Sequence, residues 1–214
     1  MSSIAKTAKR PYNAPRRAAA ATRTREAVVS SAKAQFERLG WAGTTMRSVA
    51  TEAGVSQKTV EAIFQTKAAL LQAAVDFSIR GDIRPIPMPQ RKRVKEMEAA
   101  RDVTTMLDLH AAHVRTIEER SALIAGAVEH AATSDLAVAQ LWERMTNNRR
   151  TGVRWAATTL LTKPDVANLD FAEVVEAFWV ALDWGTYRTL TGNLGMTPDA
   201  FEAWLRRYYR GMFL

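Results

Sequence analysis

Apolar residues recur at the spacing of an α-helix along most of this 214-residue chain. The clearest stripe is Met46, Val49, Ala50 and Ala53, at positions i, i+3, i+4 and i+7, which is the pattern of a helix with one buried face. An earlier stripe begins at Thr22, and others follow to the end of the chain. No segment shows the alternation of apolar and polar residues that is typical of a β-strand. The pattern therefore predicts an all-α protein.

Short polar residues and glycines mark where the first four helices begin and end. The first helix is expected to stop at Gly40, and Gly54 suits the left-handed position that follows the second. The expected capping residues for the second, third and fourth helices are Thr44 or Thr45, Ser56 and Thr66.

Prolines interrupt the helical pattern between Asp82 and Arg93. Pro85, Pro87 and Pro89 stand at alternate positions, and a helix cannot run through them because proline lacks an amide donor and has a fixed φ. We expect a partly extended connection between two domains here. Helices then resume, with expected spans of 102–118, 121–132, 135–161, 170–191 and 198 to near the C-terminus, the last one capped by Thr197.

Positive charge is concentrated at the N-terminal end of the chain. The net charge is +8, and residues 1–80 hold 13 Lys and Arg against 5 Asp and Glu, so the remainder is balanced. Such asymmetry is typical of one module that faces a polyanion and another that does not. Residues 1–21 contain no acidic residue and are interpreted as a flexible basic arm, with a solubilising tail as the alternative.

Residues 45–64 have the anatomy of a helix-turn-helix, in which a short amphipathic helix is followed by a glycine turn and a Ser-capped helix. The second helix begins with Gln57, Lys58 and Thr59. Gln can pair with adenine, Lys can donate to guanine, and Thr can contact a thymine methyl group or a phosphate. A plain helical hairpin is the alternative, which the local positive charge disfavours.

Several other classes of protein lack support in the composition. The chain has no cysteine, no apolar run of about 18 residues and no N-terminal signal sequence, so the cytoplasm is its expected location and no membrane is expected as a partner. It has no Gly-rich phosphate loop and no nucleophile elbow. A helical enzyme or metal protein would use His110 and His113 with Asp108 or Glu118, but a third ligand is not defined. We therefore expect no catalytic residue, no metal and no cofactor.

A series of short motifs follows in a specific order between residues 23 and 75: Phe36-Glu37-Arg38-Leu39-Gly40, Trp41, Thr44-Thr45, Val49-Ala50, Ala53-Gly54-Val55-Ser56, Thr59, Phe64, Thr66-Lys67 and Leu70-Leu71. These elements resemble the DNA-binding domain of the TetR family of bacterial regulators. The resemblance implies a three-helix head, joined by a fourth helix to a variable helical body. That body usually dimerises through its last two helices and often binds a small molecule.

The resemblance also implies roles for individual residues. It places Thr45 and Lys67 at phosphates, and the first turn of the recognition helix at bases or backbone. The candidate DNA-contacting residues are Thr44, Thr45, Arg47, Ser56, Gln57, Lys58, Thr59 and Lys67.

Two positions depart from the usual family pattern. Lys58 stands where the family usually has a small residue, and Glu61 stands where it usually has a phosphate-contacting tyrosine. Phosphate would repel a carboxylate at Glu61 unless the side chain points away or accepts from cytosine. Pairing with Lys58 one turn earlier is a further alternative.

The last two helices carry the apolar stripes expected of a dimer interface. The candidate interface residues are Phe178, Leu182, Phe201, Trp204, Leu205 and Tyr208. The candidate lining of a small-molecule pocket is Trp142, Trp155, Trp179, Trp184 and Tyr187. For both sets, ordinary core packing is the alternative.

The leading hypothesis is a homodimeric repressor that is released from a palindromic operator in double-stranded DNA when a small molecule binds its body. The alternative is a DNA-binding protein without an effector, held largely through its basic arm. The expected domains are the arm over 1–21, a helix-turn-helix domain over 22–80, and an effector-binding and dimerisation domain over 81–214.

Overall fold

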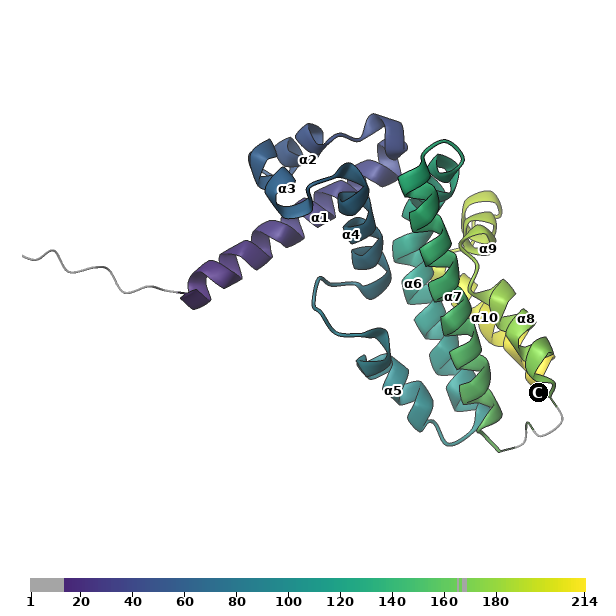
Figure 1. Ribbon diagram of the computed structural model, residues 1–214. Coiled ribbons are helices and arrows are strands. Elements are labelled where there is room, and N and C mark those ends of the chain that lie inside the picture. The colour runs from purple at the N-terminus through teal and green to yellow at the C-terminus, as the bar shows by residue number, and fades with distance from the viewer. Residues whose placement is uncertain (1–13, 165, 167–168) are drawn as a thin grey trace, which may run out of the picture.

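The structure is a computed structural model that describes residues 14–164, 166 and 169–214. Every regular element in these residues is a helix, which confirms the all-α fold class. Helices α1 to α4 form an N-terminal head, and α5 to α10 form a body (Figure 1). The bounds are α1 (Ala14–Gly43), α2 (Met46–Glu52), α3 (Gln57–Phe64), α4 (Lys67–Arg80), α5 (Lys92–Ala99), α6 (Val103–Ala132), α7 (Leu136–Leu161), α8 (Phe171–Ala181), α9 (Trp184–Arg188) and α10 (Pro198–Phe213).

The helices of the head begin at the capping residues that the sequence predicts. The side-chain oxygens of Thr45, Ser56 and Thr66 accept hydrogen bonds from the backbone N–H three residues later, at 3.0, 3.1 and 3.1 Å. Each cap satisfies an amide group that has no partner within the first turn of its helix. Gly54 takes the predicted left-handed conformation after α2, with a φ of 68°.

Helix α1 begins earlier than predicted and extends past α2 and α3 (Figure 1). The prediction of a flexible arm over 1–21 is therefore wrong for residues 14–21, while residues 1–13 lie outside the described residues. The reason is local composition, because residues 18–21 are all alanine, the strongest helix former, and Pro15 is tolerated in a first turn. The helix kinks at Gly40, where φ is 66°.

Helix α6 is one continuous helix of 30 residues, where the sequence predicted two. Between Glu118 and Ser121 the chain contains only Glu and Arg, which are good helix formers. The hydroxyl of Ser121 donates to the carbonyl of Ile117 at 2.8 Å, so this serine lies inside a helix and does not cap a new one.

The structure differs from two further predictions for the body. The sequence predicted no helix between the connection that ends at Arg93 and residue 102, but α5 forms there, and its residues Val94 and Met97 are buried. The single helix expected over 170–191 ends at Ala181, and α9 starts after Asp183, whose carboxylate accepts from the backbone N–H of Thr186 at 2.7 Å. Helices α7 and α10 have the predicted bounds within one or two residues.

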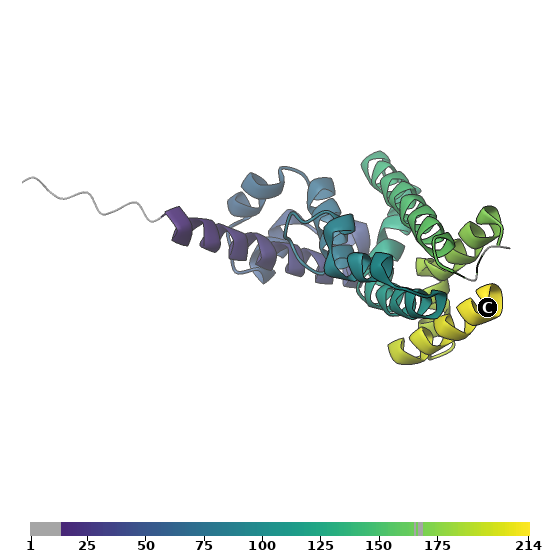
Figure 2. The same ribbon diagram turned by 90° about the horizontal axis from the view of Figure 1, so that it is seen from below.

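Helix α6 lies at the centre of the molecule. It packs against α7, α9 and α10 in the body and against α1 and α4 of the head. One hydrophobic core consequently runs from the head into the body. Helices α8 and α10 contact each other at the end of the body that is far from the start of α1 (Figures 1 and 2). None of the helices in the described part of the chain is long and apolar enough to cross a membrane.

Candidate nucleic-acid interface

Helix α2 is fixed on α1 by one buried amide side chain. Gln35 of α1 donates to Glu52 at 2.8 Å and accepts from the hydroxyl of Ser48 at 2.6 Å. Ser48 in turn completes a capping box with Thr45 at the start of α2. These contacts join both ends of α2 to α1, so the orientation of the helix-turn-helix follows from α1.

Helix α3 buries one face and exposes the start of the other. Val60 and Phe64 point into the core, and the guanidinium of Arg25 from α1 lies 4.6 Å from the centre of the Phe64 ring. Gln57 and Lys58 are exposed. Thr59 is half-buried and Ser56 is exposed, and their hydroxyl oxygens lie 2.8 Å apart. The first turn of α3 therefore presents a polar surface to solvent, and the major groove of DNA is wide enough to admit one α-helix.

Glu61 pairs with Gln57, although the sequence suggested Lys58 as a partner. The Gln57 amide donates to the Glu61 carboxylate at 2.7 Å, one turn apart on α3. Glu61 is exposed, so this bond competes with water and is weak.

At the start of α2, Thr45 and Arg47 are exposed, but Thr44 is not. The side chain of Thr44 is fully buried, and its hydroxyl donates to the carbonyl of Gly40 at 2.9 Å. The prediction that Thr44 contacts DNA is therefore wrong, because its side chain is buried and its hydroxyl is bonded to the backbone near the end of α1. The pattern of two adjacent threonines did not reveal which of them faces solvent.

Lys67 is half-buried against Trp41. Its ammonium group lies 4.2 Å from the centre of the indole and donates to the backbone carbonyl of Trp41. Desolvation lowers the pKa of Lys67, and Asp135 partly opposes that effect. The indole N–H of Trp41 also donates to Asp135 at 3.1 Å, so this aromatic residue connects the head to the start of α7.

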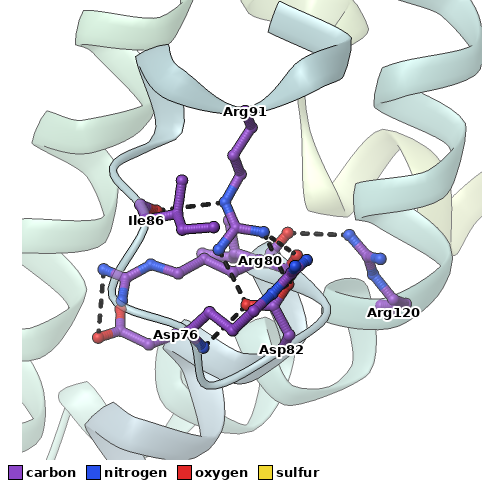
Figure 3. Close-up of polar contacts among 8 residues, drawn as sticks. Asp76, Arg80, Asp82, Ile86, Arg91 and Arg120 are labelled. Carbon is purple, nitrogen blue, oxygen red and sulfur yellow. Dashed lines mark hydrogen bonds and ion pairs between the residues drawn. The ribbon is translucent and has the colours of Figure 1, made fainter.

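The C-terminal end of α4 is held by an arginine of the body. Arg120 of α6 donates to the carbonyls of Ser78 and Ile79 at 3.1 and 2.9 Å. Figure 3 shows Arg120 reaching this end of α4 beside Arg80. Gly81, with a φ of 80°, leaves room for this guanidinium, since a Cβ there would lie 2.3 Å from one of its nitrogens. The last carbonyls of a helix have no hydrogen-bond donor within the helix, and the guanidinium of Arg120 supplies the donors here.

A second arginine reinforces the same end of α4. Arg91 donates to the carbonyl of Arg80 at 3.0 Å and forms an ion pair with Asp82 at 3.0 Å (Figure 3). Hydrogen bonds from Arg91 and then from Arg84 hold the pKa of Asp82 well below its ordinary value. We call Asp82, Arg91 and Arg120 the arginine clamp. The spacing of apolar residues did not predict the arginine clamp, because Asp82 and Arg91 lie in the connection around the prolines.

The five predicted pocket residues do not surround one space. Trp142 and Trp184 pack with their ring centres 5.7 Å apart, and the guanidinium of Arg149 lies 3.8 Å from the centre of Trp179. The other two residues face different helices: Trp155 donates to Glu98 of α5 at 3.1 Å, and Tyr187 packs against Phe201 of α10 at 4.8 Å.

Half of the predicted dimer-interface residues are core residues of a single chain. Phe178, Phe201 and Leu205 are each fully buried within the protomer, so the prediction that they form an interface surface is wrong. Leu182, Trp204 and Tyr208 remain partly exposed. An open groove of about 470 Å³ lies between α8 and α10. Its apolar lining includes Val180 and Met212, each 47% exposed.

Of the two histidines considered for a metal site, His110 is buried and His113 is half-buried. His110 is fully buried, and its Nδ1 lies 2.8 Å from the hydroxyl of Tyr209. Burial lowers the pKa of His110 to about 3 and that of His113 to about 4, so both are neutral at physiological pH. Within the described residues, no group of three His, Asp or Glu side chains is arranged to hold a metal ion.

The sequence profile described as bacterial regulatory proteins of the tetR family matches residues 28–74. Three solved structures share the fold at low identity. A TetR-family transcriptional regulator from Rhodococcus sp. has a TM-score of 0.66 and 15% identity over 90% of this chain and 99% of that one. A transcriptional regulator from Saccharomonospora viridis, in complex with choline, has a TM-score of 0.64 and 16% identity over 92% and 98%. One from Pseudomonas aeruginosa PAO1 has a TM-score of 0.62 and 15% identity over 86% and 88%. No curated protein sequence matches this chain.

Proposed function

We propose that this chain is a TetR-family repressor that a small molecule releases from a palindromic operator. The premise is that residues 28–74 match the profile of the tetR family of bacterial regulatory proteins. The observation that carries the proposal is the first turn of α3. Gln57 and Lys58 are exposed there, while the opposite face of the same helix is buried. The major groove admits one α-helix, and the side chains at its start contact base edges.

Lys58 is the residue best placed to read a base. In the part of the chain that the structure describes, its ammonium group has no ion pair or hydrogen bond, so it is available to guanine O6 and N7. Gln57 would read adenine after leaving Glu61. The exposed Thr45, Arg47 and Ser56 would contact the backbone around this helix.

A homodimer would place two such helices on successive major grooves. The proposed interface is the open groove between α8 and α10 with the partly exposed Leu182, Trp204 and Tyr208 beside it. Its exposed apolar side chains would be covered by the same surface of a second copy.

Release by an effector requires that movement in the body reach the head. Two connections support this route: the arginine clamp joins α6 to the end of α4, and Trp41 joins the head to α7 through Asp135. A ligand in the body releases DNA only if it binds one spacing of the heads better than the other. The structure of the Saccharomonospora viridis regulator is a complex with choline, which supports a small-molecule ligand for the body of this chain.

The test is binding to the DNA that flanks the chain's own coding region, measured by footprinting and by titration in the presence of unrelated competitor DNA. We expect a protected palindrome that survives the competitor. Lys58→Ala should cost about 1–3 kcal/mol of binding free energy and relax the preference at one base pair. The matched control is Lys95→Ala, because Lys95 is an exposed lysine of α5. This variant should change neither the binding free energy nor the base preference. Binding that is only non-specific and disappears with salt would contradict the proposal.

The second candidate is a DNA-binding protein without an effector, held largely through basic residues of the arm. The observation that favours it is the exposed start of α1, which carries Arg16 and Arg23 and no acidic residue before Glu26. Deleting residues 1–21 separates the two functions. A sequence-specific repressor should lose affinity uniformly and keep its preference, whereas a protein held by its arm should lose most of its binding.

A further inference from the structure

The open groove between α8 and α10 lies on the outside of the body. The two helices contact each other at the outer edge of the molecule (Figures 1 and 2). Val180 of α8 and Met212 of α10 line the groove, and each of these apolar side chains is 47% exposed. Exposed apolar surface of this kind is typical of a site that another molecule covers. The charges beside the groove indicate which molecule that is.

The α8 side of the groove is acidic. Glu173 and Glu176 are the only charged residues within α8, and both are exposed and line the groove. Neither carboxylate has an ion pair or a hydrogen bond among the residues that the structure describes. A molecule that covers the groove has to offer these carboxylates a positive charge, because a carboxylate that is removed from water without a partner costs free energy.

The α10 side of the groove supplies a free positive charge. Four of the five charged residues of α10 already have ion-pair partners within the protomer. These four are Asp199, Glu202, Arg206 and Arg210. Arg207 is the fifth; it is exposed and has no ion pair within the described part of the chain.

Arg207 lies at the edge of the same surface as the groove. It follows Trp204 by three residues, and residues at this spacing are neighbours on the surface of a helix. Trp204 in turn stacks on Tyr208, which lines the groove, with ring centres 5.4 Å apart. The surface therefore carries free acids on one helix and a free base on the other.

We propose that Glu173 and Glu176 of one copy of this chain pair with Arg207 of a second copy, and that these charges select the partner and decide which helices meet. In a two-fold dimer both subunits use the same surface, so every contact occurs twice. If α8 met α8, four glutamates would face one another. If α8 of each copy lies along α10 of the other, opposite charges meet at both contacts. The proposal rests on the homodimer of the proposed function and adds the residues that select its partner.

The test uses two full-length variants, each of which carries like charges on both helices. Glu173→Arg with Glu176→Arg makes the α8 side basic, and Arg207→Glu makes the α10 side acidic. All three residues are exposed, so both variants should keep the helical circular dichroism and the melting temperature of the wild type. The dissociation constant of each dimer is measured by sedimentation equilibrium. We expect it to rise about tenfold or more in each variant alone, because like charges then meet at both contacts.

An equimolar mixture of the two variants is the decisive measurement. In a mixed dimer, the new arginines on α8 meet the new glutamate on α10, and the other contact keeps its wild-type charges. We therefore expect a heterodimer whose dissociation constant lies within about threefold of the wild-type value. A dimer in which α8 meets α8 predicts instead that neither variant weakens when alone.

Two control variants reverse exposed charges away from the groove. Glu61→Arg with Glu143→Arg makes the same change in net charge as the double variant of α8, and Arg101→Glu makes the same change as Arg207→Glu. Both controls should dimerise like the wild type. A measurement that needs no charge reversal is the dependence on salt. Screening should weaken the wild-type dimer more than the dimer of Glu173→Gln with Glu176→Gln, which has no carboxylates to screen at these positions.

The outcomes separate this proposal from the proposed function. If the wild type dimerises and neither charge reversal weakens it, or if the mixture does not recover, the charge pairing is overturned and the homodimer stands. A wild-type chain that stays monomeric overturns both. If the mixture recovers but the chain binds no operator, the repressor function fails and the pairing between α8 and α10 is unaffected.

Discussion

The head exposes polar side chains at the start of α3, whereas the body buries the carboxyl of Glu118. In the head, Gln57 and Lys58 point into solvent, and the starts of α2, α3 and α4 are capped. In the body, Oε2 of Glu118 and Nε of Arg149 are buried without a hydrogen-bond partner among the residues that the structure describes. Water hydrates a surface group that awaits a partner, so it costs little, whereas a buried one costs free energy until a partner arrives. The comparison teaches that an exposed polar group and a buried one carry different free-energy costs while they have no partner.

The largest expected effect comes from breaking the core of the head. Phe36 of α1 is fully buried and stacks on Trp41 at 6.1 Å between ring centres. Phe36→Ala should lower the free energy of unfolding by about 3–5 kcal/mol, measured by urea denaturation. Leu39→Ala, at a side chain that is 46% exposed, is the control and should have a much smaller effect. Equal losses in the two variants would show that the head is not held by this core.

The next effect concerns the buried carboxyl of the body. Because burial raises the pKa of Glu118 in the folded state to about 8, the folded chain holds a proton that the unfolded chain releases at a lower pH. Stability from this group is present below the ordinary pKa of glutamate and is lost as the pH rises toward 8. Glu118→Gln should therefore melt at an increasingly higher temperature than the wild type between about pH 5 and pH 8. A constant difference in melting temperature across that range would contradict the shifted pKa.

Breaking the arginine clamp between the head and the body should lower the stability by an intermediate amount. Arg120→Ala removes the donors to the carbonyls of Ser78 and Ile79 and should lower the free energy of unfolding by about 1–3 kcal/mol in urea denaturation. Arg120→Lys should recover only part of this loss, since an ammonium group does not reproduce the planar guanidinium. Arg101→Ala, at an exposed position, provides the baseline.

The smallest effect is expected on the surface of the head. Glu61→Gln removes a carboxylate from α3 and should raise affinity for any duplex by about 1 kcal/mol, measured by fluorescence anisotropy. The gain should shrink as salt is added, because exposed charges are screened. The same change at Glu143 of the body should leave DNA affinity as it was. A loss of affinity in Glu61→Gln would mean that the carboxylate contacts DNA favourably.

The head could be predicted in detail from the sequence because its determinants are local. A threonine or serine before an apolar stripe caps a helix through atoms three residues away, as Thr45, Ser56 and Thr66 do. The start of α1 was missed because a basic, Pro-containing segment was interpreted as an arm, although its alanines favour a helix. Thr44 was misassigned because only the kink at Gly40 turns its side chain inward.

What the sequence by itself determined is the helical content, the turn at Gly54 and the exposed polar start of α3, since each depends on neighbours within about one turn of helix. The tertiary structure decided the rest. Phe178, Phe201 and Leu205 became core residues, Arg120 met the end of α4 from 41 or 42 positions away, and Glu118 came to face Arg149 across two helices. Burial and pairing of this kind depend on how helices pack, and an apolar or charged stripe looks the same in the sequence whichever partner it meets.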